Sequence, residues 1–162
     1  MGPVVSNPLA RAGANAGVPN SHISGGDTAC SLWPVGVIST SYGSTDACPR
    51  WPWTQPAVSR ITLYEPFSGA ADGLGTGTRV YLLWWADQAD RGVLTRRPAA
   101  GQPLEGVFTS RGPDRPNPIC LTLVVVVAVD LPELFVRGAD CVDGTPLLDI
   151  KLAITADGSL WQ

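Results

Sequence analysis

The chain has 162 residues, which suits one domain large enough to bury a hydrophobic core. Hydrophobic residues make up 44% of it and charged residues 15%, so the composition is globular and excludes a largely disordered chain. The formal net charge of -3 argues against broad, non-specific nucleic-acid binding, which needs a basic face, although it leaves room for a local basic patch.

Neither a membrane span nor an export signal is predicted. No run of 18 or more apolar residues occurs, and the N-terminus lacks a basic segment followed by an apolar core. The four cysteines form no CxxC pair, so we expect free thiols in a reducing cytoplasm. The single histidine, His22, lies in the N-terminal segment. This argues against Ser-His-Asp, Cys-His and histidine-metal sites, and no metal site is predicted.

Short strands separated by turn-forming residues dominate the chain. Residues 1–30 are rich in Ala, Gly, Asn, Pro and Ser, and we expect a flexible or loosely packed tail before one domain at 31–162. β-branched and aromatic residues predict about seven strands, at 35–39, 59–64, 79–85, 106–109, 119–129, 133–137 and 146–150. With almost no helical periodicity, this pattern indicates a mainly β fold, an antiparallel barrel or sandwich.

The segment 48–53 reads Cys-Pro-Arg-Trp-Pro-Trp, and its prolines forbid a regular helix. Two interpretations stay open. It is either a rigid surface loop whose tryptophans pack on the barrel, or a clamp in which Arg50 and an aromatic face hold a flat or anionic ligand.

Two polar, proline-containing segments flank the apolar run 121–129, which we expect to form a buried strand. The first, 109–118, carries Arg111, Arg115 and Asn117 between prolines that stiffen it. Stiffening lowers the entropy cost of holding donors against a carboxylate, a phosphate or a base edge. The second, 140–146, contains an ordinary Asp-Gly turn pair. The pairing of these two loops around one strand predicts a binding site.

The two loops also carry long sequence signatures. Residues 108–119, FTSRGPDRPNPI, and 143–151, DGTPLLDIK, closely resemble the signatures of the TrmO/YaeB-type (TsaA-like) family. Its characterised members are S-adenosylmethionine-dependent enzymes that methylate N6 of threonylcarbamoyl-adenosine in tRNA. Weaker similarity extends over roughly residues 33 to 151. The resemblance implies a small antiparallel β-barrel, usually a homodimer, that binds S-adenosyl-L-methionine without a Rossmann fold.

The resemblance also implies site residues. Cofactor contacts are expected at Pro49, Arg50, Trp51, Asp87, Gln88, Arg111, Leu121, Asp143, Gly144, Thr145 and Pro146. Acceptor contacts are expected at Arg115, Asn117 and Lys151. Methyl transfer from a sulfonium is an in-line displacement that positioning and desolvation promote without a metal or a histidine. Asp143 is the candidate catalytic carboxylate, able to accept a proton from an attacking nitrogen or oxygen.

The chain departs from the family pattern at a few positions. Asp87 replaces a usual His, Trp51 a usual Gln, and Cys120 a usual Gly, while Leu-Ala at 152–153 replaces Pro-Tyr. These departures concern the acceptor more than the cofactor. Three hypotheses therefore remain: a methyltransferase acting on tRNA, a methyltransferase acting on a small metabolite, and a non-catalytic barrel that retains the motif as a ligand or dimer surface.

The two acceptor hypotheses predict different surfaces. A tRNA substrate requires a basic surface beside the cofactor, formed by Arg50, Arg91, Arg96, Arg97 and Arg115. A small metabolite requires a closed aromatic pocket lined by Trp51, Trp53, Trp84 or Trp85.

Overall fold

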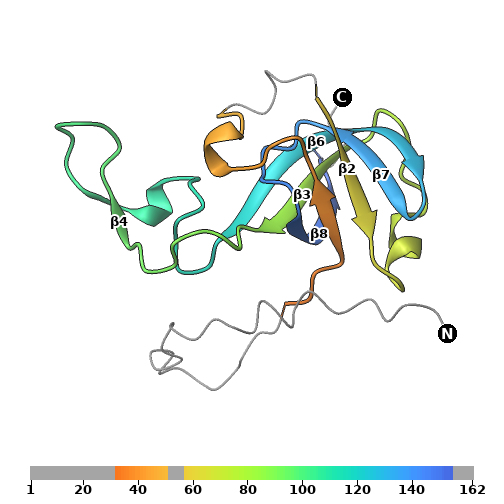
Figure 1. Cartoon of the computed structure of the whole chain (residues 1–162), viewed down its shortest axis with the longest axis horizontal. Coiled ribbons are helices and arrows are strands. Elements are labelled where there is room, and N and C mark those ends of the chain that lie inside the picture. Colours follow the sequence, from red (N-terminus) through yellow and green to blue (C-terminus); the bar gives the residue numbers. More distant parts are fainter. Residues whose placement is uncertain (1–31, 51–56, 155–162) are drawn as a thin grey trace. The chain divides into compact units, whose positions relative to one another are not determined.

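The computed structural model describes residues 32–50 and 57–154, which fall into two compact units (Figure 1). One unit comprises Pro34–Gln88 together with the chain from Pro118 onward, and we call it the barrel unit. The other contains Ala89–Asn117, and we call that segment the loop unit. The predicted tail at 1–30 lies outside the described residues.

Six antiparallel strands close the barrel in the order β1-β2-β7-β6-β3-β8. Their bounds are β1 Gly36–Ser39, β2 Val58–Leu63, β3 Arg79–Trp85, β6 Ile119–Asp130, β7 Glu133–Arg137 and β8 Thr145–Leu152. Short 3-10 helices follow β1 and β2, namely η1 at Thr45–Ala47 and η3 at Ser68–Ala71. The predicted mainly β antiparallel barrel is confirmed.

Alternating apolar side chains fill the barrel, because successive residues of a strand point to opposite faces. The inward positions are almost fully buried and include Ile38, Ile61, Leu82, Val124, Val136 and Leu147. Burying one such side chain stabilises the fold by roughly 1.5–3 kcal/mol. Along β6 only alternate residues are buried, and Leu121 is 46% exposed. The predicted buried strand is therefore present, but only its inward-facing residues are buried.

The predicted strand at 106–109 is wrong. Only β5 (Glu105–Gly106) is extended there, paired with β4 (Thr95–Arg96) in a separate two-stranded sheet of the loop unit. Residues Val107–Thr109 form the 3-10 helix η4. The Thr109 hydroxyl donates to the Gly106 carbonyl at 2.8 Å, and the Ser110 hydroxyl to the Val107 carbonyl at 2.9 Å. Such local side-chain bonds compete with a strand ladder.

The strand registers define two ends of the barrel. At one end Ile38 pairs with Thr145 and Trp85 with Ile119, so β1 and β3 finish where β8 and β6 begin. We call this the signature end. At the opposite end, β1 begins beside the last residue of β2, and β8 finishes beside the beginning of β3. Among the described residues, no helix is long and apolar enough to cross a membrane.

Candidate functional site

The Asp-Gly-Thr-Pro turn at the signature end is bonded to the chain that follows β1. The Asp143 carboxylate accepts the Thr40 backbone N–H at 2.9 Å, and the Asp143 N–H donates to the Tyr42 carbonyl at 2.8 Å. Gly144 has φ +80° and donates its N–H to the Ile38 carbonyl at 3.0 Å. A left-handed φ favours glycine, which explains why this residue stands in the turn. One oxygen of the Asp143 carboxylate therefore stabilises the fold, by joining the turn to the chain that follows β1.

The threonines around this turn also hold backbone. The buried Thr145 hydroxyl donates to the Val142 carbonyl at 2.7 Å, and the Thr40 hydroxyl donates to the Cys141 carbonyl at 3.0 Å. Pro146 lies within β8 and pairs in register with Val37. These bonds fix the turn before any ligand arrives, so backbone groups are pre-positioned at the signature end.

A chain of polar side chains lies behind the turn. The Trp84 indole N–H donates to the Thr122 hydroxyl at 3.0 Å, and that hydroxyl donates to the Asp140 carboxylate at 2.5 Å. Thr122 is 3% exposed and Asp140 half-buried. Sequence reasoning missed this network. Its only sequence signal is a threonine at an inward position of an otherwise apolar strand.

Weak acids surround Asp140. Burial raises the pKa of Cys141 to about 12. Burial, followed by the charge of Asp140, raises the pKa of Cys48 above its ordinary value. Burial also raises the pKa of Tyr42, with further contributions from Cys48 and Asp140. All three groups are therefore protonated at neutral pH.

Other predicted cofactor residues lie in the same unit. Pro49 is half-buried and Arg50 exposed, shortly after η1. Asp87 and Gln88 are exposed and directly follow β3 at the signature end. Leu121 lies on the outer face of the barrel, opposite Leu83. The predicted residues Trp51 and Trp53 lie outside the described residues.

Lys151 is far along β8 from the turn. It pairs with Tyr81, and its ammonium lies 2.6 Å from the Asp149 carboxylate. Six residues separate Lys151 from Thr145, and a strand rises about 3.3 Å per residue, so roughly 20 Å lies between them. Within this chain, the structure does not bring Lys151 together with the Asp-Gly-Thr-Pro turn.

The loop unit holds its own arginines. The Arg115 guanidinium donates to the Gly112 carbonyl at 2.8 Å and to the Ser110 carbonyl at 2.5 Å, and Arg91 donates to the Pro116 carbonyl at 2.9 Å. Arg111 and Asn117 are exposed in the same unit. The predicted stiffness of 109–118 thus has a second source besides proline, because arginines brace the loop backbone.

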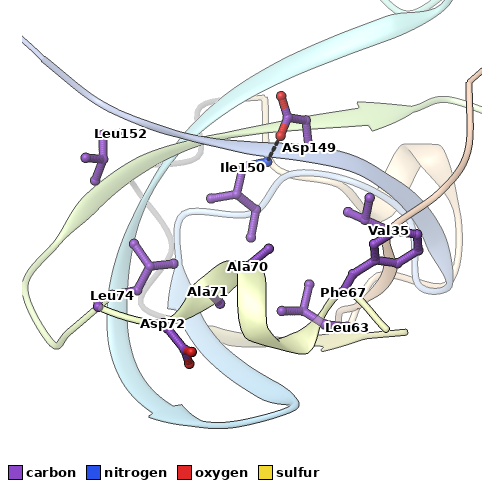
Figure 2. Close-up of a pocket in the computed structure, with 11 residues that line it drawn as sticks. Val35, Leu63, Phe67, Ala70, Ala71, Asp72, Leu74, Asp149, Ile150 and Leu152 are labelled. Carbon is purple, nitrogen blue, oxygen red and sulfur yellow. Dashed lines mark hydrogen bonds between the residues drawn. The ribbon is translucent and has the colours of Figure 1, made fainter. Parts of the chain in front are cut away.

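A cavity of about 410 Å³ opens at the opposite end of the barrel (Figure 2). Its apolar lining comes from Val35, Leu63, Phe67, Leu74, Ile150 and Leu152. It contains no tryptophan and none of the predicted site residues, so it is not the aromatic pocket that a small-metabolite substrate predicts. Among the described residues, no group of three or more His, Cys, Asp or Glu is placed to hold a metal ion.

Comparison with known proteins decides the family. Residues 37–156 match the family model described as the tRNA-methyltransferase O N-terminal domain. The chain belongs to the TrmO N-terminal domain family. Its barrel is similar to two crystal structures of TrmO, one of them from Pseudomonas aeruginosa, with TM-scores of 0.66 and 0.65 and identities of 31% and 33%. Each match covers 80% of this chain and 60% or 59% of the solved chain, so this chain spans less than two thirds of their length.

Curated relatives extend the comparison. The chain is 40% identical over 123 residues to a probable S-adenosyl-L-methionine-binding protein of Halobacterium salinarum, covering 75% of this chain and 96% of the relative. It is 36% identical over 128 residues to a putative S-adenosylmethionine-dependent methyltransferase of Pseudomonas aeruginosa, covering 75% and 55% respectively. The predicted family resemblance is confirmed.

The TrmO signatures fall in both units of this chain. The Asp-Gly-Thr-Pro turn lies in the barrel unit, whereas Arg111 and Arg115 lie in the loop unit. Cys120, one of the departures from the family pattern, lies opposite Trp84 in register and two residues before Thr122. Cys120, like Cys48 and Cys141, forms no disulfide among the described residues. The departure is therefore next to the polar network rather than remote from it.

Proposed function

We propose that this chain is an S-adenosyl-L-methionine-dependent methyltransferase. The observation that carries the proposal is the pre-formed signature end of a TrmO-family barrel, where Asp87 follows β3 and where Asp140 and Asp143 lie in the segment before β8. The names of the relatives, S-adenosyl-L-methionine-binding proteins and putative methyltransferases, support the cofactor.

The residues at this end suit such a cofactor. S-adenosyl-L-methionine carries two positive charges and one carboxylate, so acidic side chains together with arginines complement it. Arg50 and Arg111 are proposed to hold the carboxylate and Asp87 the ribose hydroxyls. The backbone of residues 143–146 is proposed to orient the remaining polar edge. When bound, the cofactor supplies a methyl group on a positively charged sulfur.

The chain's own contribution to the reaction is positioning and proton acceptance. One Asp143 oxygen bonds the Thr40 N–H, which leaves the other as the proposed proton acceptor for an attacking nitrogen or oxygen. Holding the acceptor in line with the methyl group, with water excluded, lowers the barrier through proximity and desolvation.

For the acceptor we propose tRNA, at N6 of threonylcarbamoyl-adenosine. The loop unit favours an anionic partner, since residues 89–117 contain five arginines and three carboxylates, a net charge of +2 in a chain whose total is -3. Phe108 is 82% exposed on this unit, and exposed aromatic rings beside arginines suit single-stranded RNA. Arg115, Arg111 and Asn117 are the proposed acceptor contacts.

The alternatives remain a small-metabolite acceptor and a non-catalytic ligand-binding barrel. We further propose a homodimer in the cytoplasm. The outer face of β6 exposes Ile119 and Leu121, an apolar surface that a second copy would cover. The described cysteines Cys48, Cys120 and Cys141 form no disulfide, which is consistent with a reducing compartment. Light scattering of the wild type and of Ile119→Arg tests the dimer. A monomeric wild type contradicts it.

The experiment for the function combines binding with transfer. Calorimetry measures the affinity of the wild type, of Arg111→Ala and of the control Arg60→Ala for S-adenosyl-L-methionine. Arg60 forms an ion pair with Glu133 on the barrel wall, so its replacement removes one arginine outside the proposed site. We expect weaker binding only for Arg111→Ala, by about tenfold or more, because an arginine-carboxylate contact is lost.

Transfer is measured with methyl-labelled cofactor and tRNA that carries threonylcarbamoyl-adenosine. Label in the tRNA supports the full proposal, and its formation should decrease steeply with salt. Cofactor binding without transfer to tRNA favours the small-metabolite or non-catalytic alternative. If the wild type does not bind the cofactor, the proposal is wrong.

A further inference from the structure

The geometry points to Asp140 as the residue that recognises the sulfonium charge of the cofactor, held in position by Thr122 and Trp84. The inference rests on the proposed cofactor and goes beyond it by assigning a role to a residue outside the Asp-Gly-Thr-Pro signature. It also assigns different roles to Asp140 and to Asp143 of the turn.

The Asp140 carboxylate is held in a fixed orientation. The Thr122 hydroxyl is the donor at 2.5 Å, which is the short distance typical of a charge-assisted O–H···O⁻ bond. That hydroxyl is itself fixed, because it accepts the Trp84 indole N–H at 3.0 Å and is 3% exposed. β3, β6 and the chain before β8 each contribute one member. A carboxylate that is pre-oriented in this way needs little reorganisation to meet a ligand charge.

The Asp140 carboxylate has different surroundings from the Asp143 carboxylate. An Asp143 oxygen accepts a backbone N–H and ties two loops together. Asp140 instead lies among Tyr42, Cys48 and Cys141, weak acids that burial keeps protonated. Asp140 therefore lies beside groups that stay protonated, in a partly buried setting where a carboxylate attracts a ligand cation more strongly than it does in water.

A sulfonium suits this arrangement better than an ammonium group does. An ammonium offers three N–H donors and is best satisfied by several acceptors. A sulfonium offers no N–H donor and is recognised by negative charge and by aromatic surfaces. The Trp84 ring, half-buried and fixed through its N–H, belongs to the same network as Asp140. One carboxylate with one immobile indole is the combination expected for a cation without hydrogen-bond donors.

The inference predicts discrimination between two ligands. S-adenosylhomocysteine lacks the methyl group and the sulfonium charge but retains the rest of the cofactor. Asp140→Asn keeps the shape of the side chain and removes its charge. We expect the affinity for S-adenosyl-L-methionine to decrease at least tenfold, while that for S-adenosylhomocysteine changes less than about twofold. Calorimetry with both ligands on the full chain measures this ratio.

A pair of Thr122 variants tests the positioning role. Thr122→Val removes the hydroxyl at nearly constant volume. It should decrease the preference for S-adenosyl-L-methionine over S-adenosylhomocysteine by about threefold to tenfold. Thr122→Ser retains the hydroxyl and should restore the preference to within about twofold of the wild type. Asp130→Asn, at an exposed carboxylate where β6 ends, is the matched control and should leave both affinities unchanged.

The results separate failure of the inference from failure of the proposed function. A wild type that binds neither ligand contradicts the proposed cofactor itself. A wild type that binds both, combined with an Asp140→Asn variant of unchanged preference or equal loss for the two ligands, overturns the inference alone. If Asp140→Asn does not fold, as judged by circular dichroism, the Thr122→Val and Thr122→Ser variants decide. An equal ratio of the two ligand affinities in both variants overturns the inference.

Discussion

The two ends of the barrel are stabilised in different ways. At the signature end, side-chain oxygens of Thr40 and Asp143 bond backbone groups of a neighbouring segment, and the Thr145 hydroxyl bonds the backbone of its own turn. At the opposite end, apolar side chains such as Leu63 and Ile150 surround an open cavity (Figure 2). Apolar contacts are non-directional, whereas hydrogen bonds constrain both the distance and the angle between the bonded atoms. The end with the more exact geometry is the one that carries the family signature.

The largest expected effect is on the free energy of unfolding, and it comes from the packed interior between the two ends of the barrel. Leu82→Ala removes a side chain that is fully buried between β6 and β8. We expect a loss of about 2–5 kcal/mol in the free energy of unfolding, because transfer and cavity terms add. Urea unfolding measures it. Val58→Ala, at an exposed strand position, is the control and should change stability by less than about 0.5 kcal/mol.

The second prediction is that stability depends on alkaline pH through Cys141, which lies near the signature end. The pKa of Cys141 in the folded protein, about 12, lies above the ordinary thiol value of 9.0. As the pH rises above 9, the unfolded chain releases this proton first, so stability is complete below pH 9 and is lost progressively towards pH 12. The total loss is on the order of 4 kcal/mol.

Urea unfolding of the wild type and of Cys141→Ala over this pH range measures that loss. The alanine variant should lose this part of the alkaline dependence, whereas Cys48→Ala, at a less buried thiol, should retain most of it. Identical pH profiles for the wild type and Cys141→Ala would show that burial of this thiol does not set the alkaline limit.

The third prediction concerns the turn backbone. Gly144 has φ +80°, and an added Cβ would meet no atom within 4 Å, so the cost of Gly144→Ala is backbone strain alone. We expect about 1–2 kcal/mol of destabilisation, measured by thermal unfolding. Gly75→Ala provides the comparison, since its Cβ also meets open space but its φ is not left-handed. If both variants behave alike, the strain argument is incorrect.

The smallest expected effect is at Lys151. Its ion pair with Asp149 is solvent-exposed, so Lys151→Ala should alter stability by no more than about 1 kcal/mol. Because the side chain lies far along β8 from the Asp-Gly-Thr-Pro turn, we also expect cofactor affinity to be unchanged. A calorimetric loss comparable to that of Arg111→Ala would place Lys151 in the site despite its position on the strand.

The sequence predicts the barrel strands well because period-two alternation of apolar residues is a direct consequence of strand geometry, as in β2 and β3. It fails at Val107–Thr109, where side-chain oxygens bond the local backbone. That outcome depends on hydroxyl orientation, which hydropathy does not encode. The two-stranded sheet of β4 and β5 is too short to produce an alternating pattern at all.

The candidate site is predictable only where it is contiguous in sequence. The Asp-Gly-Thr-Pro turn could be recognised as a motif, but its bond from Asp143 to Thr40 joins residues 103 positions apart. Likewise, the contact between Thr122 and Asp140 depends on the register of β6 and on the path of the chain after β7. Lys151 shows the reverse relation, since it follows the motif closely in sequence but lies far along β8 from the turn.

The place where the loop unit leaves the barrel unit has a consequence for how this family can diversify. Trp85 pairs with Ile119, and the Ala86 N–H donates to the Pro118 carbonyl at 2.9 Å, so the segment between them departs and returns through adjacent, hydrogen-bonded strands. Insertions with closely spaced stems cost the host little, because loop closure depends only weakly on length. We therefore expect that residues 89–117 can be exchanged, with junctions at Gln88 and Pro118, while the barrel sequence and its strand pairing stay intact.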